Sequence, residues 1–294
     1  MWVDEAAMTV ASYMPRSVKS FARRWLLKSS HPAHVGLRGI GAVQDLYYWV
    51  ADGRLDTLLP IQNYFSVFYP ALDTATSGSL TVFDHHGGVL GRKEFTLCHL
   101  GSLKLRLSRV LGEFNLPPSA VPQFGTLVCD IAVPAKVKET IGDAQPFYFW
   151  DRFYIGYVNQ AGQPTFVHGV DKTFIYQAGR PEPSRWYPAV REYQWAPEIP
   201  VNIAEYERFN VIMLNRVSRP KQVRLVVEDT ADRRLEWEAV IQPNGVHRFE
   251  LTPANTAGLA PTELRLRVEG MATPWSRPLV FKEFASGAIS VMHC

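Results

Sequence analysis

The chain has 294 residues, 47% of them hydrophobic and 20% charged, which is the balance of a folded protein rather than a disordered one. No apolar run approaches the roughly 18 residues of a membrane-spanning helix, and the N-terminus lacks the apolar segment of a secretory signal. The net charge of +3 arises within residues 1–30. Because the rest of the chain is neutral, we expect no nucleic-acid partner, which would require a basic face.

The N-terminal residues 5–29 predict a helix with an apolar stripe on one face. The stripe consists of Val18, Phe21, Ala22 and Trp25. Two interpretations remain open. The helix docks on the rest of the protein, or residues 16–29 lie on an anionic membrane or in the groove of a protein partner.

From Leu46 onward the sequence changes to short runs rich in β-branched and aromatic residues, separated by turn residues. The predicted strands of the first half are DLYYWV, NYFSVFY, SLTVFD, KEFTLCHL, LKLRLSRVL, GTLVCDIAV, PFYFWDRFYIGYV and PTFVHGV. Those of the second half are RFNVIMLN, QVRLVVED, RLEWEAVI, VHRFEL, ELRLRVEG, PLVFKEF and AISVMHC. Because no helical segments alternate with these runs, they predict an all-β protein built as antiparallel sandwiches or barrels.

The two halves repeat one pattern. A shift of 144 residues matches Phe65 with Phe209, Val82 with Val226, and Leu107 with Leu251. A shift of 125 residues matches the last hairpins, placing Gly162 on Gly287 and His168 on His293. The first copy therefore carries about 19 extra residues, which we expect in the 110–145 region. We predict two tandem copies of one β-sandwich or barrel-like domain.

The predicted organisation follows from these segments. It comprises a basic helix and loop (1–34), a first β domain (35–178), a linker (179–200) and a second β domain (201–294). The linker is rich in proline, which stiffens a connection, and in aromatic residues, which pack rather than face water. We therefore expect the two domains to be held rigidly.

Sequence motifs of common enzymes are missing: there is no HExxH, GxSxG, P-loop or dinucleotide fingerprint. The three cysteines, Cys98, Cys129 and Cys294, form no CxxC pair. Such thiols are typical of a reducing compartment, so we predict a cytoplasmic protein.

His168 and His293 occupy equivalent positions at the ends of hairpin strands. By strand alternation Pro164, Phe166 and His168 point the same way, so one interpretation is that each histidine caps the edge of the core. The other interpretation places both imidazoles in an inter-domain cleft, with Asp171 on the following turn as an orienting carboxylate or ligand. His168 and His293 are then the candidate ligands of a divalent metal, with Cys294 as a further donor.

Asp151 and Arg152 interrupt an aromatic run, where unpaired charges in a central strand would be costly. They form an ion pair or mark a bulge, or they face a pocket beside Tyr148, Trp150, Tyr154 and Tyr157. Aromatic faces with a carboxylate and a guanidinium suit a polyhydroxylated ligand.

Asp84, His85 and His86 precede the Gly87–Gly88 turn, and turn chemistry explains most of this segment. Two histidines beside an aspartate at a strand end are nevertheless a secondary ligand candidate.

These observations favour a cytoplasmic ligand-binding or accessory protein, with a carbohydrate or glycoconjugate as the expected ligand. The candidate ligand-binding residues are Tyr148, Trp150, Asp151, Arg152, Tyr154, Lys172, Asp84 and His85. Two alternatives stay open. One is an enzyme, metal-dependent or not, with an inter-domain site around His168, Asp171 and His293; the other is a scaffold recruited through its basic helix.

Overall fold

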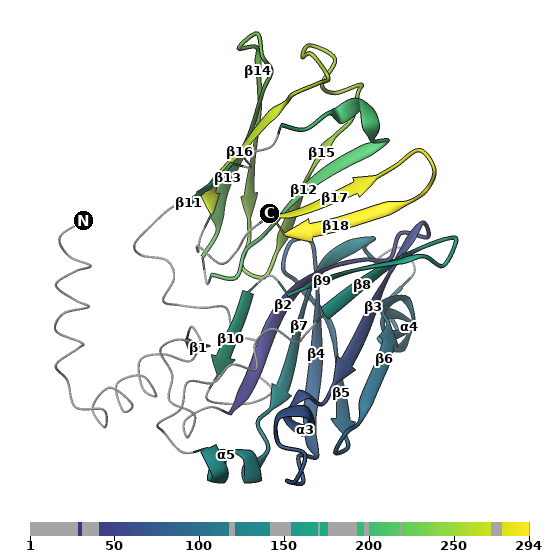
Figure 1. The fold of residues 1–294 in the computed structure, drawn as a ribbon, viewed down its shortest axis with the longest axis vertical. Helices are drawn as coiled ribbons and strands as arrows, with labels where there is room; N and C mark the ends of the chain where they lie inside the picture. Colours follow the sequence, from purple (N-terminus) through teal and green to yellow (C-terminus); the bar gives the residue numbers. More distant parts are fainter. Residues whose placement is uncertain are drawn as a thin grey trace, which may run out of the picture.

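The computed structural model describes residues 29–30, 41–117, 121–141, 154–169, 171–175, 193–196, 200–217, 219–271 and 278–293. Strands hold 55% and helices 10% of the described residues, and the described strands form four antiparallel sheets, which confirms the all-β prediction. In Figure 1 the sheets of the second half lie above those of the first. The helix predicted over residues 5–29 lies outside the described residues, except for Ser29.

The largest sheet has six strands and comes from the first half. In spatial order they are β1 (Ser29–Ser30), β10 (Asp171–Ile175), β2 (Ala42–Val50), β7 (Phe124–Ala132), β4 (Thr76–Asp84) and β5 (Val89–Leu97). All nine residues of β2 are buried, so this strand is covered on both faces. Burial on both faces explains why its sequence shows no apolar–polar alternation.

A four-stranded sheet completes the first half. Its order is β6 (Ser102–Arg106), β3 (Leu55–Gln62), β8 (Tyr154–Asn159) and β9 (Pro164–His168). Short helices α4 (Leu107–Glu113) and α5 (Ala135–Ile141) flank the sheets. Among the described helices, none is long and apolar enough to cross a membrane.

The segment NYFSVFY, predicted as a strand, contains the helix α3 (Tyr64–Phe68), so that prediction is wrong. The neighbours Phe65 and Ser66 are both buried, whereas Val67 and Phe68 are both exposed. A strand alternates its side chains between two faces and cannot produce this pattern. The backbone N–H of Tyr69 donates to Phe65 O at 2.9 Å, which closes the helical turn.

The second half forms two four-stranded sheets. One has the order β11 (Tyr193–Trp195), β16 (Arg265–Met271), β13 (Lys221–Glu228) and β14 (Arg234–Ile241). The other has the order β15 (Val246–Leu251), β12 (Arg208–Leu214), β17 (Leu279–Glu283) and β18 (Ile289–His293). A buried cluster that includes Phe209, Leu225, Phe249 and Val268 combines residues of both sheets.

The strand order of the first half recurs in the second. The series β2-β7-β4-β5 corresponds to β11-β16-β13-β14, and β6-β3-β8-β9 corresponds to β15-β12-β17-β18. Thr57 pairs with Tyr157 as Phe209 pairs with Lys282, so Thr57 is the counterpart of Phe209 at a shift of 152 residues. The match of Phe65 with Phe209 is therefore wrong, because α3 is an insertion.

The two halves share a core. The first buried cluster contains Tyr48 and Tyr157 together with Phe281, Leu279 and Val246 of the second half. The Phe281 ring lies 5.6 Å from the Tyr48 ring and 4.6 Å from the Tyr157 ring, centroid to centroid. The Tyr157 hydroxyl donates to Tyr48 O at 2.9 Å. The sheet β15-β12-β17-β18 thus contributes side chains to both clusters.

A polar link crosses the same junction. Arg216 is fully buried, and its Nη2 donates to Gln44 Oε1 at 2.6 Å. Gln44 Nε2 donates in turn to Asp130 Oδ2 at 2.7 Å. The guanidinium of the second half therefore fixes the orientation of an amide in the first.

Candidate functional site

The face of the β6-β3-β8-β9 sheet that points away from the core, called the outer face below, carries a continuous row of side chains. Arg106 pairs with Leu58, Leu58 with Gly156, and Gly156 with Phe166. Residues directly opposite each other in antiparallel strands share a face. The row therefore crosses all four strands, from a guanidinium on the β6 edge to an aromatic ring on the β9 edge.

The aromatic rings on the outer face are accessible. Phe166 is 47% exposed and Tyr154, which pairs with His168 in the next row, is 43% exposed. A Cβ atom on Gly156 would lie 2.7 Å from the Phe166 ring, so the ring lies across the glycine. Only a residue without a side chain allows the ring to lie flat on the sheet at this position.

This orientation corrects one prediction. Pro164, Phe166 and His168 are exposed, and Val167 between them is buried. The apolar face of β9 that enters the core is therefore the opposite one, and His168 does not cap the core edge.

A polar hollow of about 400 Å³ adjoins the outer face, and its lining includes Arg54, Asp56, Arg106, Ser108, Asn159 and Gln160. Asp56 accepts from the Ser108 hydroxyl at 2.8 Å and lies 3.5 Å from Arg106 Nη1. Arg54 pairs with Glu283 at 3.1 Å across the junction of the halves. The hollow thus offers both donors and acceptors on the sheet that carries the aromatic rings.

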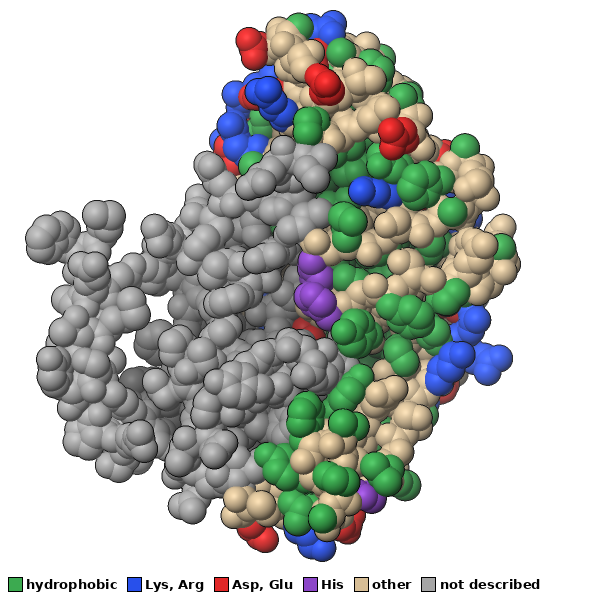
Figure 2. Space-filling view, viewed as in Figure 1, with side chains coloured by type: hydrophobic (Ala, Val, Ile, Leu, Met, Phe, Trp, Pro, Cys, Tyr) green, Lys and Arg blue, Asp and Glu red, His purple; other side chains and the backbone are tan. Residues whose placement is uncertain are grey.

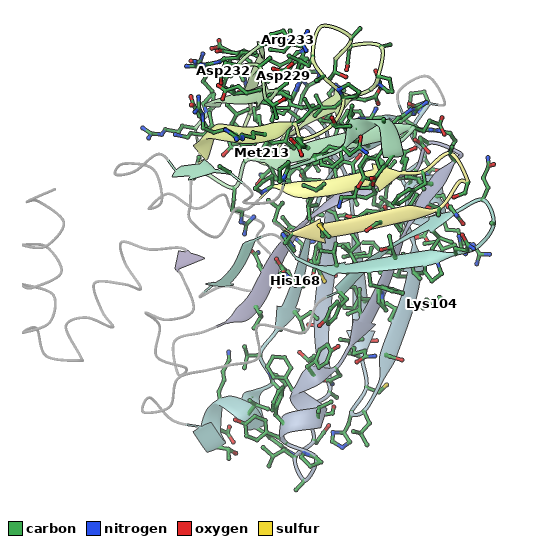
Figure 3. All side chains as sticks on the ribbon, turned by 45° about the horizontal axis from the view of Figure 1, so that its top comes forward. Lys104, His168, Met213, Asp229, Asp232 and Arg233 are labelled. Atoms are coloured by element: carbon green, nitrogen blue, oxygen red, sulfur yellow. The ribbon has the colours of Figure 1, made fainter. Side chains whose placement is uncertain are left out.

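Figure 2 shows hydrophobic side chains interspersed with polar ones over the described part of the molecule, with imidazoles near the middle of the view. Figure 3 labels Lys104 and His168 on the same four-stranded sheet. They belong to β6 and β9, the two edge strands of this sheet. The outer face therefore has a basic edge and an aromatic–imidazole edge.

His168 and His293 meet where the edge strands β9 and β18 lie beside each other. Their rings stack with centroids 4.2 Å apart and planes 20° apart. His293 Nε2 donates to His168 O at 2.8 Å, and His168 Nδ1 donates to Gly169 O at 3.0 Å. Because carbonyl oxygens only accept, these bonds fix the tautomers of the neutral rings and leave His168 Nε2 as an acceptor.

The other predicted partners of His168 are placed only in part. Asp171 was predicted to lie on a turn, but it begins β10, where it pairs with Leu46. Lys172 follows it and pairs with Asp45, so the chain passes from one sheet to another after His168. The predicted residues Tyr148, Trp150, Asp151 and Arg152, and also Cys294, lie outside the described residues.

Asp84 and His85 lie at the junction of the halves. Asp84 Oδ1 accepts from the backbone N–H groups of His86 and Gly88, both at 2.8 Å, so this carboxylate stabilises the turn. The His85 ring lies 3.9 Å from the His86 ring and 5.3 Å from the Phe124 ring. His85 O accepts from Val246 N at 3.0 Å. His85 thus joins the first half to β15.

Two histidines at this junction, His85 and His247, have lowered pKa values. Burial and the neighbouring His86 lower the pKa of His85 despite the opposing effect of Asp84. Burial lowers the pKa of His247 as well, and Arg248 and His85 add to the effect. The charged neighbour Arg248 lies over Phe124 at 4.7 Å from the ring centroid. Protonation therefore places additional positive charge in a basic, partly buried site.

Stability is expected to fall as the pH drops below about 6.5, the ordinary histidine value. A histidine whose pKa is lowered by folding binds more protons when unfolded, so its contribution is present above the unfolded pKa and lost below it. Urea unfolding between pH 8 and pH 5 checks this. A His85→Asn, His247→Asn variant should show a shallower dependence, and an unchanged one would assign the effect elsewhere.

The carboxyl group of Asp229 has a lowered pKa and a structural role. Asp229 accepts from the backbone N–H groups of Ala260, Arg233 and Ala231 and pairs with the Arg233 guanidinium, which lowers its pKa to about 2. Figure 3 shows Asp229 and Arg233 in the upper part of the molecule, away from His168. This carboxylate holds a turn together.

Among the described residues, no three His, Cys, Asp or Glu side chains come together in a way that could hold a metal ion. The stacked pair His168 and His293 supplies two nitrogen-bearing rings only. A metal at this place therefore remains a prediction.

Sequence reasoning missed Leu58, Lys104, Arg106 and Gly156 of the outer face, and named only Tyr154 and His168 of it. The available signal was the glycine opposite an aromatic residue in a hairpin, which predicts a ring lying on the backbone.

No protein-family model and no curated protein match this sequence. Similar solved structures include red sea bream transglutaminase, at 9% identity and a TM-score of 0.15, covering 90% of this chain and 30% of that one. A glycosyl hydrolase family 2 member from Bacteroides cellulosilyticus has 8% identity and a TM-score of 0.17, and the match covers 86% of this chain and 26% of that one. A β-glucuronidase from glycoside hydrolase family 2 has 8% identity and a TM-score of 0.16, and the match covers 89% of this chain and 25% of that one. The chain spans less than a third of each of these proteins, and TM-scores this low do not establish a shared fold.

Proposed function

We propose that this protein is a ligand-binding protein that recognises a carbohydrate on the outer face of the β6-β3-β8-β9 sheet. The single observation that carries the proposal is the exposed pair Tyr154 and Phe166 on a sheet face that also borders a hollow lined by charged and amide side chains. Sugars combine apolar C–H faces with hydroxyl groups. A flat aromatic surface next to donors and acceptors matches both parts.

The arrangement of the site supports this ligand class. Phe166 lies flat across Gly156, which presents the ring to a ligand from above. In the hollow, Arg106 and Ser108 can donate, whereas Asp56 accepts. The charged groups of the hollow pair with carboxylates at Asp56 and Glu283, so the site suits a neutral polar ligand better than a highly charged one.

The proposal includes two copies of one β-sandwich domain packed into a single unit. The repeated strand order and the shared core at Phe281 support this organisation. The duplication also places the edge strands β9 and β18 beside each other, so that each is covered by its counterpart.

Replacing Phe166 with alanine is expected to weaken glycan binding by 1.5–3 kcal/mol, which is about 10- to 150-fold in Kd, because a stacking surface of one phenyl ring is lost. Titration calorimetry on ligands found in a glycan-array screen measures this change. Phe166 is half exposed, so the melting temperature should change little.

The matched control is Val240→Ala, which removes an apolar side chain that is 61% exposed on β14 of another sheet. It should leave glycan affinity unchanged. Wild-type affinity in Phe166→Ala for every glycan that binds would contradict the proposed surface.

A second candidate function rests on the stacked imidazoles of His168 and His293. In this alternative the protein is an enzyme whose inter-domain site uses His168 as a base or metal ligand through its acceptor Nε2, with Asp171 and His293 assisting. Metal content of the purified protein and of His168→Ala tests it. Near-stoichiometric metal that is lost in the variant would favour the enzyme, and its absence from both would remove the metal-dependent form.

A further inference from the structure

A second polar groove lies on the six-stranded sheet, away from the outer face described above. It measures about 490 Å³, and its lining includes Ser77, Ser79, Arg92, Glu94, Thr96 and Asp130. These residues come from β4, β5 and β7. No predicted site residue belongs to this groove, and the proposed carbohydrate site does not use it.

The centre of the groove is a row of three polar side chains on adjacent strands. Ser79 pairs with Asp130 of β7 on one side and with Glu94 of β5 on the other. Directly paired residues point to the same face, so one hydroxyl lies between two carboxyl groups. The spacing of strands places the two carboxyl-bearing strands roughly 10 Å apart.

The Ser79 hydroxyl also indicates that a ligand binds in the groove. Ser79 is 3% exposed, and its Oγ has no hydrogen-bond partner among the described residues. Buried polar atoms in folded proteins are nearly always hydrogen-bonded, since an unpaired one loses its hydration without compensation. A molecule that enters the groove can supply the missing bond.

The neighbouring charges determine which kind of molecule fits. Asp130 is 2% exposed and accepts from Gln44 Nε2 at 2.7 Å. Gln44 cannot reverse its amide, because its Oε1 accepts from the guanidinium of Arg216, which only donates. Asp130 Oδ2 is therefore an acceptor. The basic residue in the lining, Arg92, already pairs with Glu94 at 3.3 Å.

We propose that this groove binds a small organic cation through primary ammonium groups. One ammonium donates to Ser79 Oγ and to the Asp130 carboxylate, and a second one reaches Glu94. A linear diamine of four carbons spans the distance between the two carboxyl groups when their side chains lean inward. The ammonium group has three donors and no acceptor, which complements a row of acceptors.

Titration calorimetry with putrescine tests the proposal on the full-length protein, with 1,4-butanediol as the neutral ligand of equal length. Putrescine should bind and butanediol should not. Ser79→Ala should weaken putrescine binding about tenfold or more, because a hydrogen bond to a charged group is lost. Glu94→Gln should weaken it as well and reduce its dependence on salt.

Thr81→Val is the matched control. Thr81 is another buried residue of β4 whose hydroxyl has no partner among the described residues, but the lining of the groove does not include it. This variant should bind putrescine as the wild type does. Both hydroxyl replacements should keep the melting temperature, since each removes an unpaired group. Equal binding of diol and diamine, no binding by the wild type, or wild-type affinity in Ser79→Ala would each overturn the proposal.

Discussion

Replacing Phe281 with alanine is expected to lower the free energy of unfolding by about 3–5 kcal/mol, the range for deleting a buried phenyl ring. Phe281 is 2% exposed and contacts Tyr48 and Tyr157 of the first half, although it belongs to β17 of the second. The ring therefore stabilises the junction as well as its own sheet. Urea unfolding followed by fluorescence and by circular dichroism measures the change.

The same experiment tests whether the halves unfold together. If they share a core, both probes should report one transition in the wild type and in the variant, shifted to lower urea. Phe281→Leu, which preserves most of the volume, should cost less than half as much. A variant in which only part of the signal shifts would show that the halves are independent units and that the shared cluster contributes little.

The repeated strand order was accessible from sequence because strand alternation persists over long stretches. The shift of 125 residues that matched His168 with His293 agrees with the register, since Tyr154 pairs with His168 and Leu279 with His293. The match of Phe65 with Phe209 failed because NYFSVFY is aromatic and reads as a strand, although it forms α3. Composition favours a strand here, whereas two adjacent buried residues followed by two adjacent exposed ones fit a helix.

The outer face was harder to predict because both faces of β9 carry apolar residues. Alternation separates Pro164 and Phe166 from Val167, but it does not say which set enters the core. The interpretation in which His168 caps the core edge requires Pro164 and Phe166 to enter the core. The structure buries Val167 instead, because Phe166 lies on Gly156 of the neighbouring strand.

The groove over Ser79 illustrates a different limit. Its row joins residues 79, 94 and 130, and the contact of Ser79 with Asp130 depends on the pairing of β4 with β7, which are separated in the chain by two strands and a helix. Local periodicity gives the face of each residue within its own strand, but not which strands become neighbours. Non-local register of this kind cannot be obtained from one sequence.

Replacing Arg216 with methionine is expected to destabilise the protein by about 1–3 kcal/mol, the usual cost of leaving a buried hydrogen-bonding group unsatisfied. Arg216 is fully buried, and its Nη2 donates to Gln44 Oε1 across the junction. Methionine fills much of the volume, so the loss reports the unpaired amide of Gln44 and its weakened hold on Asp130. Urea unfolding at pH 7 measures the change.

A double-mutant cycle with Gln44→Leu distinguishes a specific link from general loss of packing. If Arg216 stabilises the junction through Gln44, the double variant should be more stable than the sum of the two single changes predicts, by 0.5–3 kcal/mol. The Leu side chain leaves no amide to be unpaired, so the second replacement then costs less. Additive effects would contradict the link and would mean that Arg216 stabilises the second half by itself. Gln44 Nε2 also donates to Asp130, so the Arg216→Met and Gln44→Leu variants should weaken putrescine binding in the groove. Such a loss would connect the junction of the halves to the proposed cation site.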